Sequence, residues 1–354
     1  MSDARTSILL VGSVPLRDET NVFSQAGLIL GDRVSAIPDG ETGDRTNWIN
    51  WQKNVMDRTS MLERCQHVDG YGAVQVDLYA KKLNHDGDEG FPALGYASAA
   101  LRSYESFARL LAAGDIAQGT RFQVSLPTPF APMMSFIEPE SFNAIEPLYA
   151  AAMRRELDEI LAAVPHDRLA VQWDAALEFA VLEGVFPAPV RDFEPLTGRM
   201  IELASWIPAD VRLGFHLCYG DANHKHFKEP DDAGLMVDVI NHLVEHAGRP
   251  VDWFHLPVPV ARDDDAYFEP LSRLVIGPET SIYLGLVHVR DGVAGALRRS
   301  ESASKYLQGF GIATECGLGR RPSETIVPLL ILQAEIAAQL DRMRGYHKDI
   351  VRAG

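Results

Sequence analysis

Short apolar runs alternate with amphipathic stretches along most of the 354-residue chain. The runs are rich in β-branched and aromatic residues and are mostly apolar throughout, which is typical of strands buried on both faces. They lie at residues 7–14, 34–38, 120–127, 168–174, 211–219, 251–258, 281–289 and 310–316. The pattern therefore predicts eight strands, most of them buried in one parallel sheet.

Helical periodicity separates these runs. Apolar positions recur at three- and four-residue spacing in residues 139–164, 231–248 and 323–345, and Pro328 is expected to kink the last of these helices. Strands that alternate with helices indicate a parallel sheet with right-handed crossovers. Eight strands favour a closed (β/α)₈ TIM barrel over an open doubly wound sheet, although no Gly-x-Gly-x-x-Gly turn or Walker loop decides between them.

Residues 39–119 are too long for one connection between a strand and a helix, and they contain Gly- and Asp-rich pieces. We interpret them as a large helical insertion over the barrel mouth, after the second strand, with a further short strand near residues 71–78. On this interpretation residues 1–354 form a single barrel domain.

The composition is that of an ordinary globular protein, with 46% hydrophobic and 23% charged residues. Its 33 basic and 49 acidic residues give a net charge of −16, which argues against partners such as nucleic acid or an anionic membrane surface. No apolar run reaches the about 18 residues of a spanning helix, and the apolar N-terminal stretch is too short for a secretory signal. We expect a cytoplasmic protein, and a homodimer is common for an acidic barrel of this size.

The cysteines provide the most specific chemical signal. Cys65, Cys218 and Cys316 are too few for a disulfide framework. His216 and Cys218 lie two residues apart near the end of run 211–219, so both side chains point to one face, and Cys316 ends the eighth run. The C-terminal ends of barrel strands meet at the catalytic face. One imidazole and two thiolates form a soft ligand set that suits Zn²⁺ and leaves a fourth position open, where a substrate thiol would lose its proton.

Packing is the alternative role for each of these cysteines, because a buried cysteine is a common core residue. For Cys218 or Cys316 alone, packing is the more frequent role. The joint pattern of two cysteines at strand ends, one of them paired with a histidine, favours a metal site. Cys65 has no such context and is interpreted as structural.

An acidic motif follows the second run. Asp39 and Glu41, together with Arg45, lie at the expected catalytic face and could hold a substrate ammonium group or a second cation. The same motif is also a good turn sequence, whose acids would then simply be solvated. Ser13, at the end of the first run, offers a hydroxyl group to an anionic part of the substrate.

Other ionisable side chains lie at or after the ends of further strands. Asp174 ends the fourth run, while the sixth and seventh carry His255 and His288. His224 and His226 follow the fifth run in a loop, where they could bind a metal ion. A solvated loop or one that contacts substrate is the more common arrangement for such a pair.

Five segments, taken in order, resemble the catalytic domain of cobalamin-independent methionine synthase, within the superfamily that also holds uroporphyrinogen decarboxylase. His-Leu-Cys is similar to the zinc motif of that family, and Cys-Gly-Leu is similar to the segment with its last zinc cysteine. The matching segments are GSVP (12–15), VQWDAAL (171–177), FHLCY (215–219), LVHVRDG (286–292) and TECGLGRR (314–321). Gly-Ser-x-Pro is a weak signal by itself, whereas the two cysteine motifs are specific.

The resemblance implies a zinc site made by His216, Cys218 and Cys316. It also implies that Asp174 recognises an amine or another polar group of the substrate, and that His288 delivers a proton. Enzymes of this family transfer a methyl group from methyl-tetrahydrofolate, or from a corrinoid in related branches, to a thiolate held by zinc. Tetrahydrofolate is therefore a candidate co-substrate.

Two departures from the family pattern concern the same site. The usual fourth ligand, a glutamate on the sixth strand, is absent, and His255 lies near that position as a candidate fourth ligand or a polar contact. Ala175 and Ala176 replace the usual Glu-Pro, which indicates altered substrate contacts. We therefore expect a zinc-dependent methyl or alkyl transferase acting on a small thiol, with transfer in either direction. The alternatives are a metal-free decarboxylase or lyase that uses Asp39 and Asp174, and a non-catalytic binding protein.

Overall fold

A parallel sheet of eight strands forms the centre of the protein. The computed structural model describes residues 5–68, 75–85, 90–221 and 225–353. The strands follow the order β1-β10-β9-β8-β7-β6-β5-β2, and every neighbouring pair is parallel. They are β1 (Ile8–Leu9), β2 (Ala36–Pro38), β5 (Arg121–Pro127), β6 (Leu169–Ala175), β7 (Arg212–Leu217), β8 (Trp253–Pro257), β9 (Ser281–Val287) and β10 (Gly311–Thr314).

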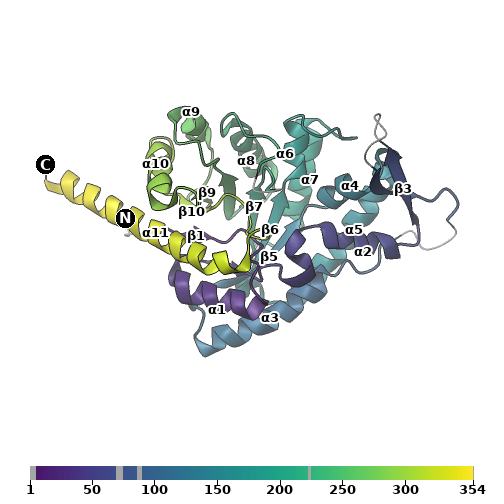
Figure 1. The fold of residues 1–354 in the computed structure, drawn as a ribbon, viewed down its shortest axis with the longest axis horizontal. Coiled ribbons are helices and arrows are strands. Elements are labelled where there is room, and N and C mark those ends of the chain that lie inside the picture. The colour runs from purple at the N-terminus through teal and green to yellow at the C-terminus, as the bar shows by residue number, and fades with distance from the viewer. Residues whose placement is uncertain (1–4, 69–74, 86–89, 222–224, 354) are drawn as a thin grey trace.

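The sheet curls into a nearly closed barrel. Just beyond the two outermost strands, β1 and β2, the backbone N–H of Val14 donates to the carbonyl of Gly40 at 2.8 Å. Each of the eight predicted runs overlaps one of the eight strands, and helices surround them (Figure 1). The prediction of a (β/α)₈ barrel is therefore confirmed.

Helices follow the strands along the chain and cover the outside of the barrel (Figure 1). The longer ones are α1 (Glu19–Leu30), α3 (Tyr96–Ala113), α5 (Pro139–Ala163), α7 (Phe193–Ser205), α8 (Gly234–His246), α10 (Gly292–Ser304) and α11 (Ile326–Ala353). The shorter ones are α2 (Lys53–Arg58), α4 (Phe130–Phe136), α6 (Leu177–Leu182) and α9 (Asp265–Phe268). Single 3₁₀ turns are η1 (Gly31–Arg33), η2 (Gly43–Asn47), η3 (Asn50–Gln52), η4 (His166–Arg168), η5 (Glu269–Arg273) and η6 (Ser323–Thr325).

The last helix differs from its expected form at Pro328. Because α11 begins at Ile326, this proline is the third residue of the helix. The first turn of a helix has no intrahelical acceptors for its N–H groups, so a proline there breaks no hydrogen bond. The expected kink inside the helix therefore has no cause.

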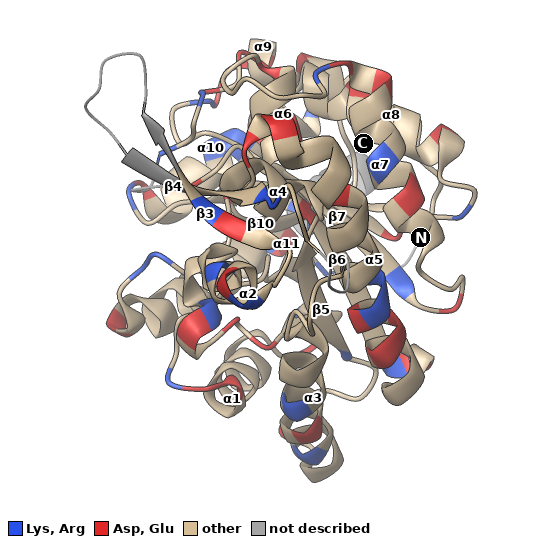
Figure 2. Cartoon of the chain, turned by 90° about the vertical axis from the view of Figure 1, so that its right-hand side faces the viewer, with Lys and Arg blue, Asp and Glu red and all other residues tan. Residues whose placement is uncertain are grey.

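The segment between β2 and β5 contains more than helices. After η2, η3 and α2, the strands β3 (Leu62–Val68) and β4 (Gln75–Lys81) form an antiparallel hairpin at the edge of the molecule (Figure 2). The short strand expected near residues 71–78 corresponds in part to β4, and residues 71–74 lie outside the described residues. Helix α3 then crosses to β5.

A carboxylate from a neighbouring helix caps α3. The residue before α3, Gly95, has no side chain that could cap it. The buried Glu156 of α5 instead accepts hydrogen bonds from the backbone N–H groups of Leu94 at 2.6 Å, Gly95 at 3.2 Å and Ala97 at 2.6 Å. This contact satisfies N–H groups at the start of the helix and fixes α3 against α5.

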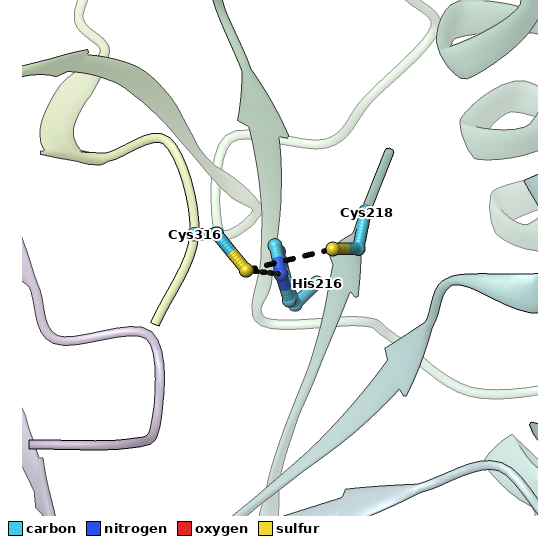
Figure 3. Close-up of side chains that lie close together, drawn as sticks. All are labelled: His216, Cys218 and Cys316. Atoms are coloured by element: carbon cyan, nitrogen blue, oxygen red, sulfur yellow. Dashed lines mark hydrogen bonds between the residues drawn. The ribbon is translucent and has the colours of Figure 1, made fainter. Parts of the chain in front are cut away.

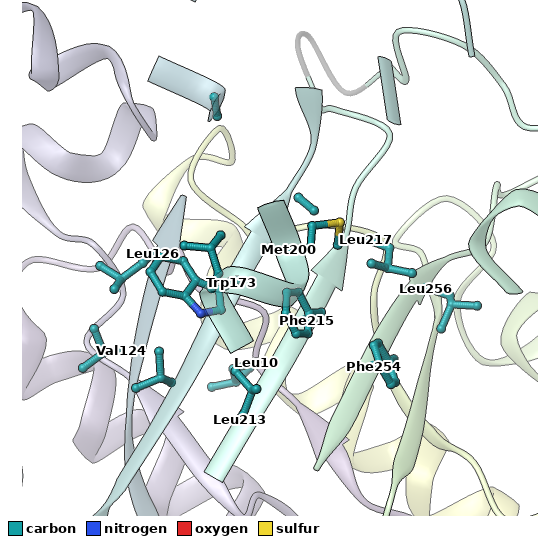
Figure 4. Packing of buried hydrophobic residues seen from close by; sticks show 14 of the residues in the cluster. Leu10, Val124, Leu126, Trp173, Met200, Leu213, Phe215, Leu217, Phe254 and Leu256 are labelled. Atoms are coloured by element: carbon teal, nitrogen blue, oxygen red, sulfur yellow. The ribbon is translucent and has the colours of Figure 1, made fainter. Parts of the chain in front are cut away.

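Alternation along β7 separates the two sides of the barrel wall. Leu213, Phe215 and Leu217 point outward into the apolar layer between strands and helices (Figure 4). Gly214 and His216 therefore point into the barrel. Lys, Arg, Asp and Glu lie mainly on the outer helices and loops, as α3 and α5 illustrate (Figure 2). Within the described part of the chain, no helix is long and apolar enough to cross a membrane.

Candidate metal centre

Three side chains from two strand ends meet at the mouth of the barrel (Figure 3). His216 belongs to β7, Cys218 follows that strand, and Cys316 follows β10. The two sulfur atoms lie 3.6 Å apart, and the Cys316 sulfur lies 3.7 Å from Nε2 of His216. One ligand atom from each residue lies within 4.8 Å of the others, and no second cluster of this kind occurs among the described residues.

The geometry of these atoms fits zinc. Bond lengths of about 2.3 Å to sulfur and about 2.0 Å to nitrogen in a tetrahedral site imply S···S and S···N separations of about 3.8 and 3.5 Å. The Cys218–Cys316 and Cys316–His216 separations of 3.6 and 3.7 Å lie close to these values. Two sulfur donors and one imidazole also match the ligand preference of zinc.

The pKa values of the two cysteines at this cluster are shifted in opposite directions. A hydrogen bond from Cys316 holds the pKa of the Cys218 thiol well below its ordinary value, although burial opposes this. The same bond, together with burial, raises the pKa of Cys316 well above its ordinary value. Burial lowers the pKa of His216, but the neighbouring Cys218 outweighs it, so the pKa of His216 is raised. Cys218 is therefore the group that first becomes a thiolate.

The structure places His255 behind His216 and not among the three converging side chains. Its Nδ1 lies 2.7 Å from Nδ1 of His216, and its Nε2 lies 3.0 Å from the carbonyl oxygen of Thr314. Burial, and then the neighbouring His216, hold the pKa of His255 well below its ordinary value. Both nitrogens of the candidate fourth ligand are thus engaged by protein atoms.

A cavity of about 270 Å³ opens at the three converging side chains. This volume is just below the range of about 300–1,000 Å³ that is typical of sites for drug-sized ligands. Its lining includes Ser13, Asp174 and His226 from the predicted site, besides Val11, Gly12, Thr46, Trp48, Ala176, Leu177, Phe186, His216, Cys218, Gly220, Asp221, Lys225, Phe227, Cys316, Gly317, Gly319 and Arg320.

Two buried carboxyl groups lie close to the metal cluster. The side-chain amide of Gln172 donates to Asp174 at 2.8 Å, and burial raises the pKa of Asp174 to about 8. Burial also raises the pKa of Glu41 to about 7, although a hydrogen bond from the Ser13 hydroxyl opposes this effect. Asp174 and Ser13 line the cavity themselves, whereas Glu41 reaches it through Ser13.

The rest of the acidic motif holds its own loop together. One oxygen of Asp39 accepts hydrogen bonds from Arg45 at 2.6 Å and from Ser103 at 2.9 Å, and the other accepts from the backbone N–H of Glu41 at 2.9 Å. Neither Asp39 nor Arg45 lines the cavity. Glu41 itself has a φ of 49°, a left-handed conformation that is uncommon for a residue with a side chain. These bonds keep Glu41 in that conformation beside Ser13.

A line of ionisable groups connects His288 to the cavity. His226 lines the cavity and forms an ion pair with Glu315 at 3.0 Å, and Glu315 lies 3.6 Å from Nδ1 of His288. Burial lowers the pKa of His226, but Glu315 outweighs burial and raises it to about 9. His288 does not line the cavity, its Nε2 contacts the carbonyl of Val258 at 2.9 Å, and burial lowers its pKa.

The aromatic part of the lining was not predicted from the sequence. Trp48, Phe186 and Phe227 all face the cavity, and the rings of Phe186 and Phe227 lie 6.3 Å apart. Trp48 and Phe227 lie in the segments that follow β2 and β7, and Phe186 lies after α6, the short helix that follows β6. A position beyond the end of a barrel strand is the signal that could have found them. His224, predicted beside them, lies outside the described residues.

Comparisons with known proteins agree with the fold. No protein-family model matches the chain, and no curated protein matches its sequence. A B12-independent methionine synthase from Shewanella sp. W3-18-1, solved in complex with selenomethionine, is similar in structure, with a TM-score of 0.58 and 14% identity over 97% of this chain and 100% of that chain. A putative vitamin-B12 independent methionine synthase from Listeria monocytogenes has a TM-score of 0.57 and 15% identity over 95% of this chain and 99% of that chain. The chain therefore shares the fold of these proteins over nearly its full length.

Proposed function

We propose that the protein is a zinc-dependent methyl or alkyl transferase that acts on a small thiol. The observation that carries this proposal is the convergence of His216, Cys218 and Cys316 at a cavity, with separations that fit tetrahedral zinc. Three protein ligands would leave one position for a substrate. The shared fold with methionine synthases of the B12-independent class supports the same assignment.

Bound zinc would supply a positive charge that lowers the pKa of an entering thiol, so that the thiol loses its proton near neutral pH. In the transfer, a bond forms between the thiolate sulfur and the methyl carbon. The bond from that carbon to the donor atom breaks, and its electron pair stays with the donor. Asp174 and the Ser13–Glu41 pair are the groups that would hold a polar part of the substrate beside the sulfur.

The size of the cavity favours small reactants. A volume of about 270 Å³ suits a small thiol with a methylated small molecule better than the larger methyl-tetrahydrofolate. The same residues would serve transfer to the thiol and the reverse reaction, because both pass through one transition state.

A leaving group that needs a proton would receive it along the line from His288 through Glu315 to His226. His226 is the member of this line that faces the cavity, so it would make the final contact. We therefore propose that His288, the proton donor implied by the family resemblance, acts through His226. Replacement of His226 by glutamine should lower activity with such donors more than it lowers zinc content.

The alternative of a metal-free decarboxylase or lyase has less support. It requires Asp39 and Asp174 to face a common substrate, but both oxygens of Asp39 are engaged within its own loop, away from the cavity lining. No observation at the site favours this chemistry over metal-assisted transfer.

The first test is the metal content of the purified protein. About one zinc per chain is expected, and Cys218→Ser or Cys316→Ser should abolish it. Cys65→Ser is the matched control, because Cys65 lies in the peripheral hairpin beside Glu138 and should leave zinc content unchanged. Wild-type protein that holds no zinc after purification without chelators and after reconstitution would rule out the proposal.

The second test is turnover. Zinc-loaded protein is mixed with small thiols and methylated donors, and thioether formation is followed by mass spectrometry. Formation of a methylated thiol that requires both Cys218 and Cys316, and is insensitive to Cys65→Ser, supports the proposal. Carbon dioxide release or an elimination product, independent of zinc, would support the decarboxylase or lyase instead.

A further inference from the structure

A line of polar groups lies inside the barrel, behind the metal cluster. His216 of β7 and His255 of β8 are register partners in adjacent parallel strands, with 2% and 0% exposure respectively. Their Nδ1 atoms lie 2.7 Å apart, and Nε2 of His255 lies 3.0 Å from the carbonyl oxygen of Thr314 at the end of β10. Burial excludes water from both imidazoles, so these contacts must satisfy their polar atoms.

The direction of each hydrogen bond follows from the chemistry of the groups. A carbonyl oxygen can only accept, so Nε2 of His255 carries a proton and donates to Thr314. A neutral imidazole has one N–H, which leaves Nδ1 of His255 as an acceptor. The 2.7 Å contact then requires the proton to lie on Nδ1 of His216. The remaining nitrogen of His216, Nε2, is the one that lies 3.7 Å from the sulfur of Cys316.

We propose that His255 is a positioning residue for the zinc site, which holds the ring and tautomer of His216 so that Nε2 is presented as a ligand. This inference rests on the proposed zinc chemistry. It differs from the interpretation of His255 as a fourth ligand, because it leaves three protein ligands and keeps the fourth position for the substrate. Partners behind a metal-binding histidine commonly set its orientation and basicity.

The same line reaches a second ligand. Thr314 accepts from His255 through its carbonyl, while its hydroxyl donates to the carbonyl of Cys316 at 2.8 Å. One residue at the end of β10 therefore contacts both the histidine line and the turn that carries Cys316. His255 thus couples the placement of ligands from β7 and β10, strands that are not neighbours in the sheet.

Two substitutions separate the hydrogen bonds from the bulk of the ring. His255→Leu keeps an apolar side chain of similar size but can neither accept from His216 nor donate to Thr314. His255→Gln keeps one acceptor and one donor on a flexible side chain. Leu256→Val is the matched control, because Leu256 is the next residue of β8 and points outward into the apolar layer (Figure 4).

Zinc affinity is measured by competition with a chromophoric chelator, and cobalt-substituted protein reports the ligand set through its absorption spectrum. His255→Leu is expected to weaken zinc binding about 10–100-fold. His255→Gln should restore most of the lost affinity, and Leu256→Val should bind zinc about as tightly as the wild type. In the His255→Gln variant the cobalt spectrum should keep its cysteine-to-metal bands and should indicate the same coordination number as in the wild type. Unchanged affinity in His255→Leu, or a coordination number that falls in both His255 variants, would overturn the proposal.

A further measurement on the wild type needs no variant. Long-range ¹H–¹⁵N NMR of the histidine rings distinguishes the two neutral tautomers. His255 should carry its proton on Nε2 in the metal-free and in the zinc-loaded protein. His216 should carry a proton on Nδ1 in both, and the ¹⁵N signal of its Nε2 should shift on addition of zinc. The opposite tautomer of His255 would directly refute the proposed hydrogen bonds to His216 and Thr314. Wild-type protein that binds no zinc would instead refute the proposed function, while the NMR result would still decide the hydrogen bonds.

Discussion

The two ends of the barrel interior are filled in different ways. At one end the inward-facing positions carry apolar side chains that pack together, with Trp253, Tyr283 and Leu9 among small alanines. Gly214 faces Trp253 across the β7–β8 pair, and a Cβ atom there would lie only 1.9 Å from the indole ring. This end is a closely packed core in which shape decides which residue is tolerated.

The other end keeps ionisable groups in place of apolar ones. On the same face of β7, His216 follows Gly214 after two residues, and Cys218 follows beyond the strand end. These two groups are also buried, but they line a cavity, and both contact Cys316. Buried polar groups contribute less to stability than packed apolar ones. One strand thus supplies stability at one end and reactive groups at the other, two residues apart.

The largest expected effect is at the packed end. Gly214→Ala forces a methyl group into the Trp253 ring, and the structure can accommodate it only by moving the indole or the strand. The free energy of unfolding should fall by about 3 kcal/mol, the upper end of the usual cost of overpacking. Urea denaturation measures this loss, with Cys218→Ser as the control at the mouth, where a change below about 1 kcal/mol is expected. A fully stable Gly214→Ala protein would show that the barrel interior is not as closely packed as described.

A buried acid beside the mouth should make stability depend on pH. Burial raises the pKa of Glu178, at the start of α6, from 4.5 to about 7. The unfolded chain ionises first as pH rises, so the wild type loses stability between pH 4.5 and about 7 and stays at the lower level above that. Glu178→Gln removes this loss. The free energy of unfolding of the variant, relative to that of the wild type, should therefore rise by about 3 kcal/mol between pH 4.5 and pH 8. Urea denaturation of both proteins at both pH values measures this gain. An equal difference in free energy of unfolding between variant and wild type at pH 4.5 and pH 8 would contradict the raised pKa of Glu178.

The thiols at the mouth should be sensitive to oxidation when metal is absent. The sulfur atoms of Cys218 and Cys316 lie 3.6 Å apart, so a disulfide needs only a small movement. Oxidised glutathione should convert both thiols to a disulfide and be reduced in turn, leaving Cys65 as the single free thiol per chain. Thiol titration and peptide mapping measure this, and added zinc should protect both cysteines. Mixed disulfides at Cys65 alone would argue against the described geometry.

The smallest effect is expected at the aromatic lining. Phe186 is 43% exposed, so its replacement by alanine should cost little stability. Its ring nevertheless faces the cavity and packs near Phe227. Phe186→Ala should raise KM about tenfold and leave kcat nearly unchanged, because in the proposed function the ring would contact the bound substrate without taking part in the transfer. A fall in kcat with unchanged KM would place Phe186 in the reacting part of the site.

Local patterning along the chain is enough to predict the eight barrel strands and their succession. Apolar run length and alternation are local properties, and each of the eight runs overlaps a strand. The same local rule placed His216 and Cys218 on one face, two residues apart. The sequence could not place the cap of α3, because Glu156 lies about 60 residues away from the N–H groups that it satisfies.

Only the tertiary structure decided which of the candidate residues meet. Asp39, Glu41 and Arg45 share one short motif, yet Glu41 approaches the cavity while the other two hold the loop. His255 and His288 were expected in the site itself, yet the first lies behind His216 and the second behind Glu315. The physical reason is that curling of the sheet brings strands such as β7 and β10 together across the barrel. A strand's own sequence specifies the side on which a residue lies, but not which residue from a distant strand it will face.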